Sequence, residues 1–227
     1  MIVAPAQLSG FLGRMEPVID ELIDRLSKTE FRDDPIGGAK YARATSIMSS
    51  AYKRHGQLLG RAILERLKDC HRVHAWTEGE FKLSHASAAE VSKGMPPTTY
   101  RSFHLPYGEA AHSGPVDLIV HCQSAGTIRA YNIKRGNGLY DGGKRRLMMS
   151  ELLRTQMLLL DYGRQLGVEA DEAQAYMIFY YGLRSIPEPF SLTGSDLDAH
   201  FEFPIQEAVE LVNDRFRTRL HAMIEGS

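Results

Sequence analysis

The spacing of apolar residues predicts four helices along the chain. In four stretches, apolar side chains recur every three to four residues, which gathers them on one face of a helix. Pro17 lies inside the first stretch, where we expect a break or kink, because proline cannot donate a helical hydrogen bond. The predicted helices cover 6–28, about 41–69, about 144–166 and about 205–224.

Shorter runs of β-branched and aromatic residues predict strands in the middle of the chain. Two of them, 115–121 and 127–134, are joined by a turn at 124–126 and form a predicted hairpin. A Gly-rich loop over 136–143 then leads into the third helix. The remaining predicted strands are 73–76, 80–83 and 174–181.

Two long stretches lack a clear period. We expect 86–114 to form a short helix followed by an irregular segment, and 182–203 to form a loop. Long loops of this kind often carry function. The order of helices and strands predicts an α/β fold with a mixed sheet. A chain of 227 residues suits one domain, and we expect its core over about 50–182, with the helices at 6–28 and 205–224 as additions.

Composition narrows the class of protein. Hydrophobic residues make up 43% of the chain and charged residues 24%, which excludes a disordered or fibrous protein. No apolar run approaches the ~20 residues that span a membrane, and no secretory signal is evident. Two cysteines, Cys70 and Cys122, cannot build a disulfide framework. We therefore expect a cytoplasmic protein with no membrane partner.

Charge is distributed unevenly along the chain. The net charge is −1, but residues 40–72 hold eight basic and two acidic residues, and residues 127–154 hold seven basic and two acidic residues. The stretch 168–210 holds nine acidic residues and one arginine. A basic surface attracts phosphate, although ordinary solvated faces would explain the same pattern.

Three residues of the predicted hairpin suggest chemistry. Asn132 and Lys134 share one face of their strand, because side chains alternate across a strand. The paired strand can bring Asp117 to the same edge. Oxygen ligands of this kind hold Mg²⁺, which polarises a phosphate and activates a bound water, and a nearby lysine can orient that water or stabilise developing charge.

This segment resembles the PD-(D/E)xK nuclease superfamily, which includes many type II restriction endonucleases. The residues that carry the resemblance are Asp117 after Pro115-Val116, then Asn132-Ile133-Lys134, and then a helix. The resemblance covers about residues 50–182. It implies a three-layer α/β core in which helices flank a mixed central sheet, Mg²⁺ as cofactor, and cleavage of double-stranded DNA. A homodimer is expected if the target is a palindrome.

The chain departs from the family pattern at Asn132, where the superfamily has an acid. The resemblance implies that a carboxylate from elsewhere completes the metal site with Asp117. Glu151, on a largely apolar helix, is the first candidate, because a carboxylate among apolar neighbours is costly unless it is paired or bound to metal; a pair with Arg154 is the alternative. The other candidates are Glu65, at the edge of the apolar stripe of its helix, and Asp141.

Further residues are expected to contact DNA. The resemblance suggests Gln156, on the helix after the Gly-rich loop, as a residue near the scissile phosphate. The loop has the spacing GxGxxxGG, which matches neither a dinucleotide-binding nor a Walker motif. We interpret it as backbone over a phosphate, with basic residues at the following helix N-terminus. These basic residues are Arg135, Lys144, Arg145 and Arg146.

Three functions are compatible with these features. The first is a Mg²⁺-dependent DNA endonuclease, most like a restriction enzyme, with Asp117, Asn132, Lys134, Glu151 and Glu65 in its catalytic site. The second is a catalytically inactive nucleic-acid-binding or structural protein on the same fold, which Asn132 favours. The third is a small-molecule enzyme that binds a nucleotide on the Gly-rich loop.

Overall fold

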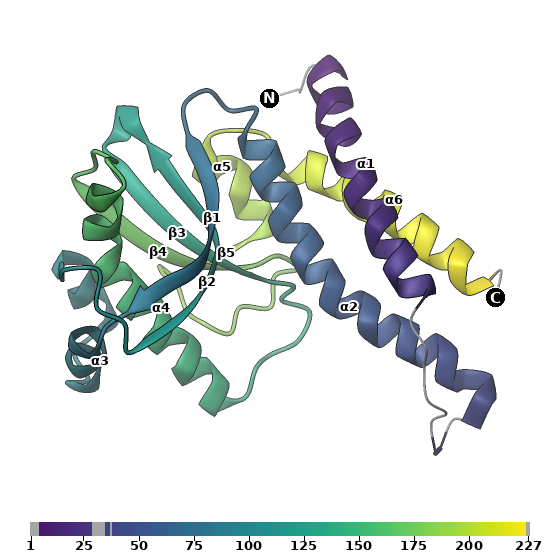
Figure 1. The fold of residues 1–227 in the computed structure, drawn as a ribbon, viewed down its shortest axis with the longest axis horizontal. Coiled ribbons are helices and arrows are strands. Elements are labelled where there is room, and N and C mark those ends of the chain that lie inside the picture. Colours follow the sequence, from purple (N-terminus) through teal and green to yellow (C-terminus); the bar gives the residue numbers. More distant parts are fainter. Residues whose placement is uncertain (1–4, 29–34, 37, 226–227) are drawn as a thin grey trace. The chain divides into compact units, whose positions relative to one another are not determined.

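The computed structural model describes residues 5–28, 35–36 and 38–225, which belong to two compact units (Figure 1). One unit is helical and combines Met1–Asp69 with Phe201–Ser227. The other, Cys70–His200, contains the sheet. The start at Cys70 differs from the expected core over 50–182, because the helix before the sheet belongs to the helical unit. Most of the loop expected around Pro35 lies outside the described residues.

The helical unit consists of α1 (Pro5–Ser27), α2 (Gly38–Leu67) and α6 (Gln206–Glu225), which all pack against one another. Their bounds agree with the predicted helices to within about three residues. α1 continues through Pro17 without a break. Its buried side chains, which include Phe11, Met15 and Ile19, keep the helical period across the proline. No helix in the described part of the chain is both long and apolar enough to cross a bilayer.

The sheet unit is an α/β fold with a mixed sheet, as predicted, and the sheet has five strands. The strands lie in chain order; β1, β2 and β3 are antiparallel neighbours, whereas β3, β4 and β5 are parallel. β1 merges two predicted strands into one, and β5 lies inside the stretch predicted to be a loop. The strands are β1 (His74–Leu83), β2 (His112–Cys122), β3 (Thr127–Lys134), β4 (Glu172–Phe179) and β5 (Ser191–Thr193).

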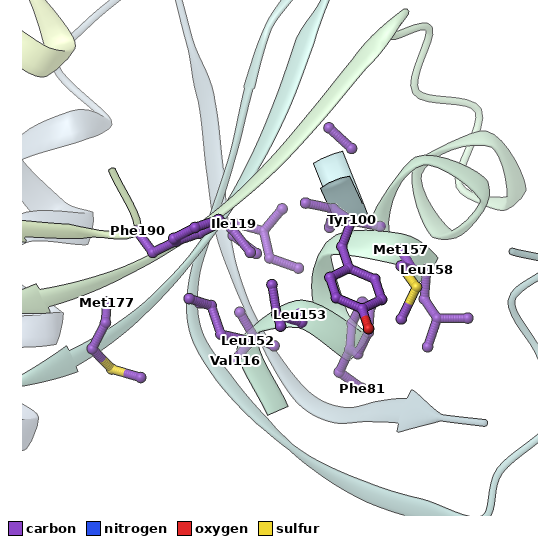
Figure 2. Close-up of a cluster of buried hydrophobic side chains, with 14 of the residues drawn as sticks. Phe81, Tyr100, Val116, Ile119, Leu152, Leu153, Met157, Leu158, Met177 and Phe190 are labelled. Atoms are coloured by element: carbon purple, nitrogen blue, oxygen red, sulfur yellow. The ribbon is translucent and has the colours of Figure 1, made fainter. Parts of the chain in front are cut away.

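Helix α4 (Gly142–Gln165) connects β3 to β4 and packs on one face of the sheet. The core beneath it is apolar: one cluster of buried side chains includes Ile119 and Met177 from the sheet and Leu152 and Met157 from the helix (Figure 2). The segment after β1 folds as α3 (His85–Ser92) and a 3₁₀ turn (Pro97–Ser102), both against α4, which agrees with the predicted short helix and irregular segment. The predicted loop over 182–203 also contains the short α5 (Leu197–Phe201).

A β-bulge in β2 lies at the start of the predicted hairpin. Between the pairs Trp76–Ile119 and Glu78–Val116, β2 carries one residue more than β1. A bulge turns consecutive side chains toward one face of a sheet. As a result both Val116 and Asp117 line the same cavity on the α4 side of the sheet.

The chain leaves β3 through a backbone turn that requires glycine. Gly136 has φ of +69°, and a Cβ atom there would lie 2.8 Å from the backbone carbonyl carbon of Phe179. Its carbonyl accepts a hydrogen bond from the amide of Leu183 at 2.9 Å. This close approach holds the loop after β3 against the loop after β4.

Gly136→Ala is therefore expected to destabilise the protein by about 2 kcal/mol or more, because it adds both a left-handed backbone strain and a clash with rigid backbone. Gly138→Ala is the matched control: it lies in the same loop, has no positive φ, and its Cβ would meet no atom within 4 Å. Urea denaturation followed by circular dichroism measures both. Equal stability of the two variants would contradict the tight packing at Gly136.

Candidate functional site

A cavity of about 220 Å³ lies between the sheet and the second to fourth turns of α4. Four of the residues expected in the catalytic site line it: Asp117, Asn132, Lys134 and Glu151. Its apolar wall is made by Phe81, Leu83, Val116, Met148 and Met177. All four polar residues are partly exposed, so the cavity is reached by solvent. The sheet and α4 thus bring together groups that are 34 residues apart in the chain.

Asp117 is held where β2 and β3 separate. The last backbone pair of these strands is Leu118–Tyr131, and the next contact is made by side chains. The Asp117 carboxylate accepts a hydrogen bond from the amide of Ile133 at 2.6 Å, and the amide of Asp117 donates to Oδ1 of Asn132 at 3.4 Å. These two bonds hold Asp117 in place beside the cavity that it lines.

Lys134 ends β3 and brings a positive charge to the cavity. Its carbonyl accepts a hydrogen bond from the amide of Tyr180, which fixes the backbone. Among the described residues, its ammonium group makes no hydrogen bond and no ion pair. A half-buried charge without a partner is costly, so an anion entering the cavity would find a cation ready to bind it.

Glu151 reaches the cavity from the third turn of α4. It does not form the predicted alternative pair with Arg154, whose guanidinium donates instead to the Ser84 carbonyl and to the Ser87 hydroxyl, both at 3.2 Å. Burial lowers the pKa of Arg154, and the charge of Glu151 opposes this shift. The two charges therefore interact through space, while the Glu151 carboxylate remains available to the cavity.

The oxygen atoms of this cavity form a small donor set for a cation. Within the described residues, no three or more His, Cys, Asp or Glu side chains are close enough to hold a metal ion. The cavity supplies two carboxylates, from Asp117 and Glu151, and the amide oxygen of Asn132. Mg²⁺ commonly keeps several waters and is held by one or two carboxylates together with substrate phosphates. The residues therefore fit Mg²⁺ in number and in chemistry.

Glu65, the other expected ligand, lies in the helical unit and has protein partners of its own. Its side chain is 4% exposed and pairs with Arg14 at 3.2 Å, Arg61 at 2.9 Å and Lys68 at 2.7 Å. Burial alone would raise its pKa, but the hydrogen bond from Lys68 and the charge of Arg61 outweigh burial and lower the pKa. These three cations give Glu65 a structural role in place of the expected metal ligation.

Asp141 also has a structural role. It is the N-cap of α4, and its carboxylate accepts a hydrogen bond from the amide of Lys144 at 2.9 Å. This hydrogen bond has the largest effect and lowers the pKa of Asp141, and a hydrogen bond from the amide of Gly143 lowers the pKa further. An N-cap satisfies one of the free amides at a helix start, which explains Asp141 without a metal ion.

Gln156 is buried under the sheet and is not available to DNA. Only 1% of the residue is exposed. Its amide nitrogen donates to the carbonyl of Ala173, and its amide oxygen accepts from the amide of Ala175 at 2.7 Å. Gln156 therefore satisfies the backbone of β4, and this replaces the predicted contact with nucleic acid.

The four basic residues expected to contact DNA lie on the loop after β3 and on the first turn of α4. Lys144, Arg145 and Arg146 are exposed. The Lys144 ammonium lies 4.7 Å from the centre of the Tyr140 ring, and the Arg135 guanidinium lies 5.9 Å from the centre of the Tyr181 ring. Arg135 directly follows Lys134 in the chain, and the other three cations lie at the start of α4, where the loop after β3 ends.

Two residues that the sequence analysis missed also line the cavity. His112 is the first residue of β2, and Thr155 lies one turn after Glu151 on α4. The position of Thr155 could have been predicted from that of Glu151, because residues four apart share a helix face. His112 could not be found from the sequence, because its place depends on the bulge that changes the register between β1 and β2.

Comparison with known proteins gives no further assignment: no protein-family model, no curated protein and no solved structure matches this chain. The residues of the cavity are therefore the basis for any inference about function.

Gln156→Met is expected to lower the free energy of unfolding by about 3 kcal/mol, because two buried backbone groups of β4 lose their partners. Gln165→Met is the matched control on the same helix: its amide donates to the Tyr107 carbonyl and to Asp161 at an exposed position, and we expect a loss below about 1 kcal/mol. Chemical denaturation compares them. A stable Gln156→Met protein that binds DNA less well would reinstate the predicted DNA contact.

Proposed function

We propose that this protein is a Mg²⁺-dependent endonuclease that hydrolyses phosphodiester bonds of double-stranded DNA, most like a type II restriction endonuclease. The observation that carries the proposal is the convergence of Asp117, Asn132, Lys134 and Glu151 on one solvent-reached cavity. A carboxylate pair beside an unpaired lysine, close to a run of exposed cations, matches the requirements of phosphate chemistry.

The order of the elements supports a restriction-endonuclease-like core. A long helix is followed by three antiparallel strands, a helix and a parallel strand, with the sequence Asn-x-Lys at the end of the third strand. The carboxylate that the resemblance requires in the strand before it is Asp117. The proposed fold is the three-layer α/β core of that superfamily.

Each residue of the cavity has a proposed role in hydrolysis. Asp117 and Glu151 would hold Mg²⁺ through their carboxylates, and Asn132 would assist through its amide oxygen. The metal ion, when bound, polarises the phosphate and lowers the pKa of a water molecule. Lys134 would orient the attacking water and stabilise the negative charge that develops on the phosphate.

The surroundings of the cavity suggest the partner and the setting. Lys144, Arg145 and Arg146 would bind DNA phosphates beside the scissile bond. We further propose that the protein acts as a homodimer on palindromic targets and resides in the cytoplasm, where its two free cysteines, Cys70 and Cys122, would stay reduced.

A catalytically inactive DNA-binding protein is the second candidate, and a specific observation favours it. The oxygen of Asn132 accepts a hydrogen bond from the amide of Asp117, so this position can serve the fold without a metal ion. Both candidates predict DNA binding, but only the nuclease predicts cleavage.

Lys134→Ala is expected to reduce Mg²⁺-dependent cleavage of mixed DNA by about 100-fold or more, because the ammonium group acts on the attacking water. Lys82→Ala is the control, since Lys82 is an exposed lysine of β1 in the same unit. Gel analysis of digested DNA measures both. Intact DNA with the wild-type protein across divalent metals, combined with DNA binding, would support the inactive protein instead.

Asn132→Asp tests the metal site without relying on cleavage. Without metal, the new carboxylate repels that of Asp117, and we expect the midpoint of thermal unfolding to fall by a few degrees, about 1 kcal/mol. With Mg²⁺ the variant should recover and gain more stability than the wild type does. Differential scanning calorimetry with and without Mg²⁺ checks this.

Glu151→Gln removes a carboxylate from the cavity, whereas Asn132→Asp adds one. The increase in the midpoint of thermal unfolding that Mg²⁺ causes should therefore be smaller in Glu151→Gln than in the wild type. If Mg²⁺ shifts the midpoint equally in the wild type, Asn132→Asp and Glu151→Gln, the cavity does not bind the metal.

A further inference from the structure

The two neighbouring loops that follow β3 and β4 expose apolar side chains to solvent. Leu139 lies in the loop after β3 and is 69% exposed. Tyr181 and Leu183 lie in the loop after β4 and are 44% and 46% exposed. Packing in the core does not explain these three residues, because a leucine or tyrosine that stabilises the core would be buried.

Hydrogen bonds join these two loops into one surface. The amide of Leu183 donates to the carbonyl of Gly136 at 2.9 Å, and the amide of Tyr140 donates to the Ser185 hydroxyl at 3.0 Å. The two bonds lie on either side of Leu139 in the chain. Because β3 and β4 are parallel, both loops leave the same edge of the sheet, where Lys134 enters the cavity.

Basic residues flank Leu139 along the chain. Residues 134–146 contain five basic residues and one acidic residue, Asp141, whose carboxylate caps α4. Arg145 and Arg146 form no ion pair with any acid among the described residues. An apolar tip between cations is complementary to DNA, in which a stack of apolar base faces lies between two rows of phosphates. A protein partner would need acidic groups placed on both sides of an apolar patch.

We propose that Leu139 is a wedge that enters duplex DNA between neighbouring base pairs, while the cations on either side of it hold the flanking phosphates. This inference rests on the proposed function and specifies how the substrate is bound. Inserted apolar side chains unstack a base step and bend the duplex, at a cost of a few kcal/mol per step that added contacts offset. The bend would present a phosphate beside the wedge to Lys134 and Glu151.

Binding to duplexes with one weakened step tests the wedge. A duplex that carries a single abasic site or mismatch is already partly unstacked, so the wild type should bind it about tenfold more tightly than an intact duplex. Leu139→Ala should reduce this preference below about twofold, and Leu139→Met should retain most of it. Fluorescence anisotropy in Ca²⁺, used in place of Mg²⁺ to prevent cleavage, gives the affinities.

The matched control is Leu166→Ala, at the opposite end of α4, where Leu166 is 56% exposed. It should leave the preference for the weakened duplex unchanged. A second measurement uses duplexes that carry a 2-aminopurine base, whose fluorescence rises when the base is unstacked. This fluorescence should rise on binding of the wild type and of Leu166→Ala, but not on binding of Leu139→Ala.

The outcomes separate this inference from the proposed function. If the wild type cleaves DNA and Leu139→Ala shows the same duplex preference and the same 2-aminopurine signal, the wedge is overturned and the nuclease stands. If Leu139→Ala changes only the oligomeric state of the protein, the loops form a contact between copies of the chain and the wedge is again overturned. If no variant binds duplex DNA, both proposals fail.

Discussion

The site depends on the hydrogen bond between the Asp117 carboxylate and the amide of Ile133. At this point β2 and β3 stop pairing through their backbones, and an amide of β3 would otherwise lack a partner. The Asp117 carboxylate fills that place, and this bond holds the side chain beside the cavity that it lines. An acid in this position stabilises the separation of two strands as well as supplying a ligand, so the same residue serves the fold and the proposed chemistry.

The electrostatic balance of the cavity explains how an asparagine can stand at position 132. Three carboxylates around one lysine would repel one another strongly in the absence of a cation, because the cavity walls are partly apolar. With Asn132, two carboxylates share the cavity with Lys134, and the net charge is close to that of one acid. Asn132 keeps the hydrogen bond to the amide of Asp117 and lowers the cost of the site in the metal-free protein. A site with Asn132 also attracts a cation less strongly than a site with a third carboxylate. Binding of the cation therefore depends more on Glu151.

The sequence predicted the mixed sheet and four of its five strands, although it divided β1 in two and missed β5, because hydrophobic period and turn residues are local signals. The predicted bounds of β3 and of the helix after it agree with the structure to within about two residues. The alternation of side chains along a strand correctly predicted that Asn132 and Lys134 share a face. What failed was not local. The three cations that engage Glu65 come partly from α1, about 50 residues away, and the burial of Gln156 depends on how α4 rests on β4. The bulge in β2, which brings His112 and Val116 to the cavity, depends on pairing with β1 and leaves no pattern in the sequence.

The setting of α4 links the core to the site. Gln156 bonds to the backbone of β4 and so fixes both the rotation and the height of the helix on the sheet. Because α4 leads from the C-terminal end of β3 back to the start of its parallel neighbour β4, residues that precede Gln156 on the helix lie toward the C-terminal end of β3. Glu151 is one of these residues and lines the cavity, and the exposed cations at the start of α4 precede it. A change in the packing under Gln156 would move the carboxylate, the cations and the capped start of the helix together, because one rigid element carries all three.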